Sequence, residues 1–96
     1  MFEEYIPHIY DILITIPTDK LYEWDSDVRE LLHNKIKEYQ RSSDINVIYV
    51  MNLTNYGNNN LVNSHIQFSI YKDSVLGHTS FDVYKEDIRK WKLKNI

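Results

Sequence analysis

The sequence predicts a single α+β domain, in which an antiparallel sheet of three to four strands packs against helices in the order β-α-β-β-β-α. Three observations predict this class. Residues 27–41 carry an apolar stripe at helical spacing, and residues 45–54 and 61–71 alternate apolar and polar positions on either side of a stretch rich in Asn and Gly. The length of 96 residues suits one domain with its own core.

The N-terminal segment 9–16 fits two structures. It is dense in β-branched residues, and its alternate positions are Ile12, Ile14 and Ile16, a pattern typical of a strand that Pro17 would end. A helix starting at Pro7 competes with the strand. The stripe of that helix would be Ile6, Ile9, Leu13 and Ile16. We predict the strand.

Residues 27–41 give the clearest element, an amphipathic helix that ends at the polar residues 42–44. Its apolar face is formed by Val28, Leu31, Leu32, Ile36 and Tyr39. Asp27, with Glu30 three residues later, is similar to a capping box in which Asp takes the place of Ser or Thr. Acids come early and bases late along this segment, which complements the helix dipole.

Residues 45–54 and 61–71 predict a β-hairpin. One face of the first strand carries Ile45, Val47, Tyr49, Met51 and Leu53, and one face of the second carries Val62, Ile66, Phe68 and Ile70. If the hairpin is symmetric about the turn at 55–60, Val47 lies opposite Phe68 and Tyr49 opposite Ile66. A third strand over 77–84 follows a turn around Asp73 and Ser74.

The C-terminus fits a helix over residues 85–92 with a frayed tail, because Tyr84, Ile88 and Trp91 have helical spacing. The perfect alternation of residues 90–94 would also suit a strand, and we predict the helix. The second face of the sheet is unusually apolar. It carries Ile48, Val50 and Tyr71 beside His65 and Gln67, so either the C-terminal helix covers it or a partner or dimer mate does.

Composition narrows the class of protein. The chain has no cysteine, which excludes disulfides, thiolate catalysis and cysteine zinc sites. No apolar stretch approaches the roughly 18–20 residues that span a membrane, so we expect a cytoplasmic protein without a membrane partner. The chain has no alanine but nine Asn and twelve Ile, residues favoured by AT-rich codons. This bias indicates an AT-rich genome. A short acidic domain from such a genome is often an accessory protein of a virus or mobile element, which would place the chain in the host cytoplasm.

Charge is divided unevenly along the chain. Residues 1–30 carry eight acids against two bases, a net charge of −6, while residues 31–96 carry nine bases against six acids, a net charge of +3. Aromatic residues rimmed by charge are typical anchors of protein interfaces. We therefore predict a non-enzymatic module that binds a basic surface of a host nucleic-acid-handling or defence protein and inhibits or modulates it. Its predicted partner-binding residues are Tyr22, Glu23, Trp24, Asp25, Asp27 and Glu30.

No catalytic residue, metal site or cofactor is predicted. The histidines His8, His33, His65 and His78 have no metal-ligand spacing, and no nucleophile elbow or glycine-rich phosphate loop is present. The crowded acids before residue 31 border a helix start, where ionised carboxylates are favourable without catalysis. A small enzyme with a histidine–carboxylate site is a weaker hypothesis than either a protein-binding module or a nucleic-acid-binding domain.

Nucleic-acid binding is the alternative function. The basic C-terminal segment would carry it through Arg89, Lys90, Lys92 and Lys94. The α-β-β-β-α order of residues 27–93 resembles that of a double-stranded RNA-binding domain. Such domains place a lysine cluster at the start of the last helix, whereas this chain has Lys85, Glu86 and Asp87 there. Phosphate binding needs several uncompensated cations, so the net charge of −3 disfavours nucleic acid as the partner.

Overall fold

The computed structural model describes residues 1–21, 26–52 and 64–94. The elements, in order, are η1 (Glu3–Tyr5, a 3-10 helix), α1 (Ile6–Leu13), α2 (Thr18–Leu21), α3 (Ser26–Ser43), β1 (Asn46–Asn52), β2 (His65–Tyr71), β3 (His78–Tyr84) and α4 (Lys85–Lys94). The strands form one antiparallel sheet in the order β1-β2-β3. The predicted α+β class is therefore confirmed, while the element order differs at the N-terminus.

The predicted strand over residues 9–16 is wrong, because this segment forms most of α1 and the turn that follows it. Pro7 lies in the first turn of α1, where its missing N–H leaves no hydrogen bond unmade. The competing helical stripe is the one that packs in the core, since Ile9, Leu13 and Ile16 are fully buried. β-Branched content is a weak preference, and burial of one helical face overrides it.

Helix α3 confirms the predicted helix over 27–41 and extends it slightly at both ends. Val28, Leu32 and Ile36 are buried, as the stripe predicts, whereas Leu31 is 41% exposed. Because the helix begins at Ser26, Asp27 lies inside its first turn, where a carboxylate complements the helix dipole.

The remaining elements lie close to their predicted positions. β1 and β2 occupy the two predicted alternating segments, and β3 and α4 match the predicted third strand and C-terminal helix. The alternative strand over 90–94 is wrong, because these residues belong to α4. Leu53 and Val62, assigned to the apolar face, lie outside the described residues.

The hairpin register differs from the prediction by two residues. Val47 lies opposite Ile70 and Tyr49 opposite Phe68, so the predicted partners Phe68 and Ile66 are wrong. Because side chains alternate with a period of two, this shift leaves every side chain on its predicted face. The prediction assumed a connection centred on residues 55–60, and the centre of the connection sets the register.

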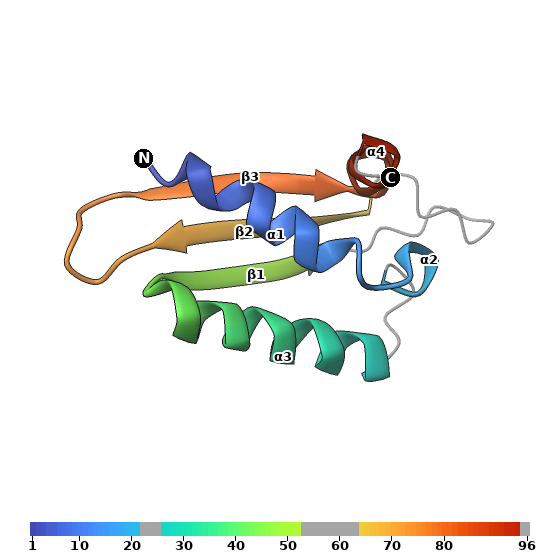
Figure 1. The fold of residues 1–96 in the computed structure, drawn as a ribbon, viewed down its shortest axis with the longest axis horizontal. Helices are drawn as coiled ribbons and strands as arrows, with labels where there is room; N and C mark the ends of the chain where they lie inside the picture. The colour runs from blue at the N-terminus through green and yellow to red at the C-terminus, as the bar shows by residue number, and fades with distance from the viewer. Residues whose placement is uncertain (22–25, 53–63, 95–96) are drawn as a thin grey trace.

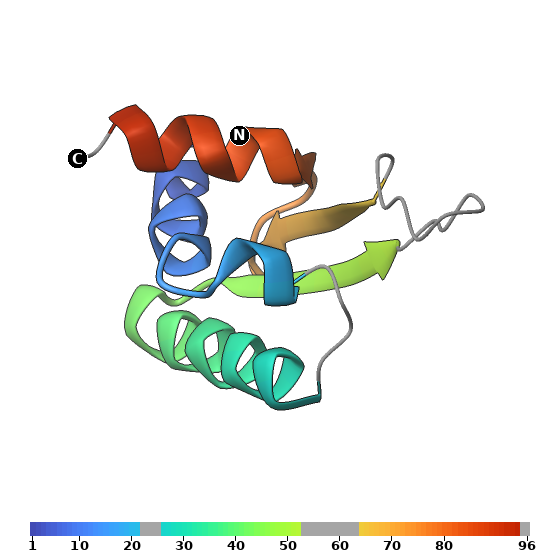
Figure 2. The same ribbon diagram turned by 90° about the vertical axis from the view of Figure 1, so that its right-hand side faces the viewer.

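One layer of helices and one sheet share the core. α1 lies across one face of the sheet, α3 runs beside β1, and α4 lies at the end of β3 (Figures 1 and 2). The sheet residues buried under the helices are Val47, Met51, Ile66, Phe68, Ile70 and Val83. In the described part of the chain, no helix is long and apolar enough to cross a membrane.

The other face of the sheet is open. Ile48 and Val50 are each 53% exposed there, so the first of the two alternatives, in which the C-terminal helix covers this face, is wrong. α4 packs against α1 instead. The Trp91 indole Nε1 donates a hydrogen bond of 3.0 Å to Asp11 Oδ1, and the Trp91 and Tyr10 rings stack with centroids 5.2 Å apart.

Candidate docking surface

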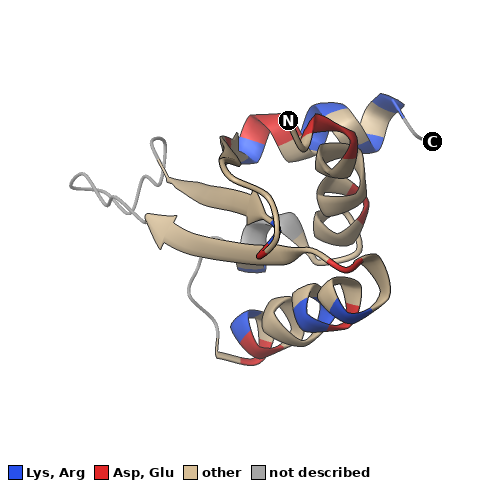
Figure 3. Ribbon diagram, turned by 90° about the vertical axis from the view of Figure 1, so that its left-hand side faces the viewer, with Lys and Arg blue, Asp and Glu red and all other residues tan. Residues whose placement is uncertain are grey.

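Two of the six predicted partner-binding residues lie in the described structure. Asp27 and Glu30 are both exposed at the start of α3. The other four, Tyr22, Glu23, Trp24 and Asp25, lie outside the described residues. Figure 3 shows that charged residues are concentrated on the helices, whereas the sheet is nearly uncharged. Within the three strands, Asp82 is the sole Asp, Glu, Lys or Arg.

A groove of about 550 Å³ separates α3 from β1. Its helical wall is a stripe spaced i, i+3, i+4 and i+7, formed by Ser26, Arg29, Glu30 and His33. Its strand wall is formed by Tyr49, Val50 and Met51. We call this feature the α3–β1 groove. Its volume falls within the roughly 300–1,000 Å³ of typical ligand-binding clefts.

Tyr49 connects the α3–β1 groove to the core. Its hydroxyl lies 3.5 Å from His33 Nδ1, while its ring packs against Phe68 with centroids 5.9 Å apart. Burial raises the pKa of Tyr49, and the positive charge of Arg29 opposes that rise. Tyr49 is therefore a neutral phenol at neutral pH. Arg29 and Glu30 are both exposed on the opposite wall, so the α3–β1 groove offers one cation and one carboxylate beside apolar surface.

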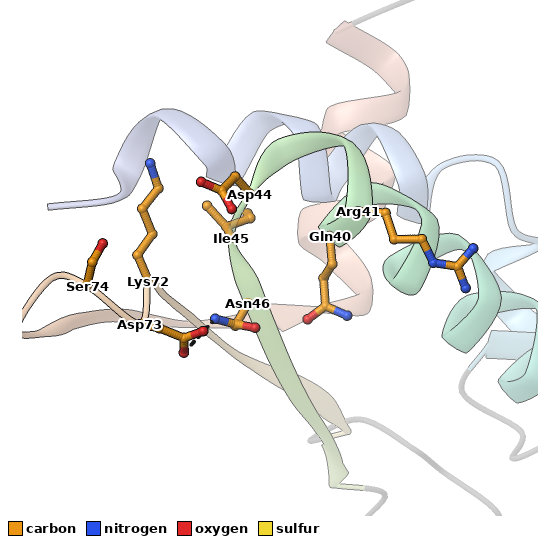
Figure 4. Close-up of a pocket in the computed structure, with 8 residues that line it drawn as sticks. All are labelled: Gln40, Arg41, Asp44, Ile45, Asn46, Lys72, Asp73 and Ser74. Atoms are coloured by element: carbon orange, nitrogen blue, oxygen red, sulfur yellow. Dashed lines mark hydrogen bonds between the residues drawn. The ribbon is translucent and has the colours of Figure 1, made fainter.

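A second hollow, of about 410 Å³, lies between the C-terminal end of α3 and the turn that joins β2 to β3 (Figure 4). Its lining residues are Gln40, Arg41, Asp44, Ile45, Asn46, Lys72, Asp73 and Ser74. Asn46 Nδ2 donates a hydrogen bond of 3.1 Å to Asp73 Oδ1. Figure 4 shows Arg41 and Lys72 pointing in different directions, and two carboxylates share the hollow with them. The two cations do not converge on a single anion site.

The two histidines on the strands, His65 and His78, do not lie together in one site. His65 Nε2 lies 3.3 Å from Asn52 Nδ2 and 3.7 Å from Asp82 Oδ1, on the open face of the sheet. His78 pairs with Tyr71 at the opposite end of β2 and β3, so the two strand histidines are far apart in register. The described residues contain no group of three His, Cys, Asp or Glu side chains that could hold a metal ion.

The basic residues of the alternative function all lie on α4. Arg89, Lys90, Lys92 and Lys94 are exposed. At about 100° per residue their positions are distributed around the helix rather than along one face. Arg89 forms an ion pair of 2.7 Å with Glu86, and the Lys94 Nζ lies 5.7 Å from the centre of the Trp91 ring. The structure therefore places these cations on one helix without forming a single basic stripe.

Sequence reasoning missed Arg29, His33 and Tyr49 as groove residues. A partial signal was present, because the helical wall has regular helical spacing next to the apolar stripe. No local pattern indicates that α3 lies beside β1. Neither family models nor curated proteins nor solved structures gave a match to this chain.

Proposed function

We propose that this chain is a non-enzymatic protein-binding module that docks on a basic surface of a host nucleic-acid-handling or defence protein, and inhibits or modulates it. The α3–β1 groove carries the proposal, because it joins an apolar strand wall to the carboxylate of Glu30, with Asp27 on the same helix. An apolar centre with a charged rim is the usual anatomy of a protein interface. The role as a viral or mobile-element accessory protein is supported by composition alone.

The acidic N-terminal third would act mainly on the rate of association. Its net charge of −6 attracts a basic partner, and such steering raises association rates by roughly 10–1,000-fold. This attraction is screened over about 8–10 Å at physiological ionic strength. Binding should therefore weaken as salt is added, with apolar contacts in the α3–β1 groove supplying the salt-insensitive part.

The test is a pull-down with the tagged full chain from a lysate of the natural host, with and without nuclease, analysed by mass spectrometry. The docking variant carries Asp27→Lys and Glu30→Lys. The control variant carries Glu4→Lys and Glu38→Lys, which change the net charge equally at exposed positions away from the α3–β1 groove. We expect the control to retain the partner and the docking variant to lose it. Equal retention with the same salt dependence would refute the proposal.

Nucleic-acid binding through Arg89, Lys90, Lys92 and Lys94 is the second candidate, favoured by the exposure of all four side chains. It predicts that nuclease treatment removes whatever the chain captures. It also predicts that Lys90→Glu with Lys92→Glu abolishes capture, and that affinity falls steeply with salt. Capture that needs intact nucleic acid would move the active surface to α4.

A further inference from the structure

One hydrogen bond shows which residues of β1 point their backbone N–H and C=O groups away from β2, toward the outer edge of the sheet. The Val47 N–H donates to Gln40 Oε1 over 2.6 Å, and Gln40 belongs to α3, which runs along the side of β1 away from β2 (Figure 1). In an antiparallel strand the N–H and C=O of one residue point to the same side, and this side alternates along the chain. Tyr49 and Met51 therefore direct their backbone N–H and C=O groups outward as well.

These outward groups face the α3–β1 groove, because Tyr49 and Met51 form its strand wall. Among the described residues, no turn, loop or side-chain hydrogen bond ends on the backbone of either residue. Val47 differs from them, since the Gln40 side chain satisfies its N–H. An edge strand whose outward N–H and C=O groups have no hydrogen-bond partner is a template on which another strand can pair.

We propose that the α3–β1 groove binds an extended segment of the partner protein, which adds to the β1 edge as a further strand. This inference rests on the proposed function and deepens it by naming the partner's conformation. Backbone hydrogen bonds to Tyr49 and Met51 would hold the segment, and its alternate side chains would enter the groove. The segment would place Lys or Arg opposite Glu30 and no cation opposite Arg29, because both of these charged side chains are exposed on the facing wall.

The position of α3 favours a single segment over a second copy of the chain. In an edge-to-edge dimer two whole sheets must approach along their edges, and α3 lies beside the β1 edge in every copy (Figure 2). An extended segment is narrow enough to lie between a helix and a strand. The groove volume of about 550 Å³ is also ample for a few residues of such a segment.

The probe is a displayed library of random peptides about a dozen residues long, selected against the full chain. The tightest peptide is then synthesised with single N-methyl groups at successive backbone amides. Because alternate amides of an added strand face the edge, methylation at one set of alternate positions should weaken binding about tenfold or more. Methylation at the other set should leave Kd within about twofold, and serves as the matched control.

Amide hydrogen exchange of the full chain supplies the second measurement. In the free chain the Tyr49 and Met51 amides should exchange quickly, and with bound peptide they should slow about tenfold or more. The Val47 amide, already bonded to Gln40, should not change. Strand addition would be overturned if no peptide could be selected, or if methylation weakened binding equally at both sets of alternate positions. It would also be overturned if the Tyr49 and Met51 amides were already protected from exchange in the free chain.

Failure of this inference and failure of the proposed function give different results. If a host partner depends on Asp27 and Glu30, but its binding leaves the Tyr49 and Met51 amides at their free rates, docking stands and strand addition is wrong. If the selected peptide shows alternating sensitivity to methylation, but Glu30→Lys and added salt leave its Kd unchanged, the groove binds strands without the proposed charge recognition.

Discussion

Leu13→Ala is expected to lower the free energy of unfolding by about 2–5 kcal/mol, the usual cost of truncating a buried leucine. Leu13 is fully buried in α1, and the loss combines apolar transfer with the cavity left behind. A domain of 96 residues has a total stability of roughly 5–14 kcal/mol, so this one change removes a substantial part of it. At roughly 4–8 °C per kcal/mol, Tm should fall by about 8 °C or more.

Ile12→Ala is the matched control, one position away on the same helix. Ile12 is only partly buried, and alanine has the higher helix propensity, so we expect a loss of about 1 kcal/mol or less. Urea unfolding followed by far-ultraviolet circular dichroism measures both variants. In a strand, Ile12 would share the buried face with Ile14 and Ile16, and Leu13 would lie on the other face. A larger loss for Ile12→Ala than for Leu13→Ala would refute the reasoning.

Two further predictions use the same unfolding assay. Gln40→Ala should lower the free energy of unfolding by about 1–3 kcal/mol, because the part-buried Val47 N–H loses its acceptor. The control Gln67→Ala, on the open face of the sheet, should lower it by about 0.5 kcal/mol or less. Similar losses in the two variants would contradict the placement of the Val47 N–H at the outer edge of β1. Burial raises the pKa of Tyr10 and Tyr49 above the ordinary tyrosine value of 10.0, so the phenols of the unfolded chain ionise first. Stability should therefore hold below about pH 10 and fall as pH rises further, and replacing both by Phe should reduce that fall. An unchanged alkaline profile in the double variant would show that these phenols do not contribute.

Local patterns in the chain were sufficient to predict α3, the three strands and α4. Each of these elements shows one clear period, either the helical spacing of Val28, Leu32 and Ile36 or the alternation around Phe68 and Ile70. Such periodicity reports which side of an element is buried, and that information is present within a single element. The acids Asp27 and Glu30 at the start of α3 were found in the same way, because helix starts favour carboxylates.

The tertiary structure decided the N-terminal element and the hairpin register. Residues 9–16 carry both periods at once, and only packing against the sheet selects the face containing Ile9 and Leu13. The pairing of Tyr49 with Phe68 depends on the centre of a connection that the alternating pattern leaves undetermined.

By itself, the sequence determined the α+β class, the buried faces of α3 and of the three strands, and an acidic N-terminal third. The α3–β1 groove was decided by tertiary structure alone, because its walls come from Glu30 and its helical neighbours on one side and Tyr49 and Met51 on the other. The apolar face of an element is recorded in the periodicity of that element's own residues. The distance between two elements depends on how the whole core closes, and no local pattern records that.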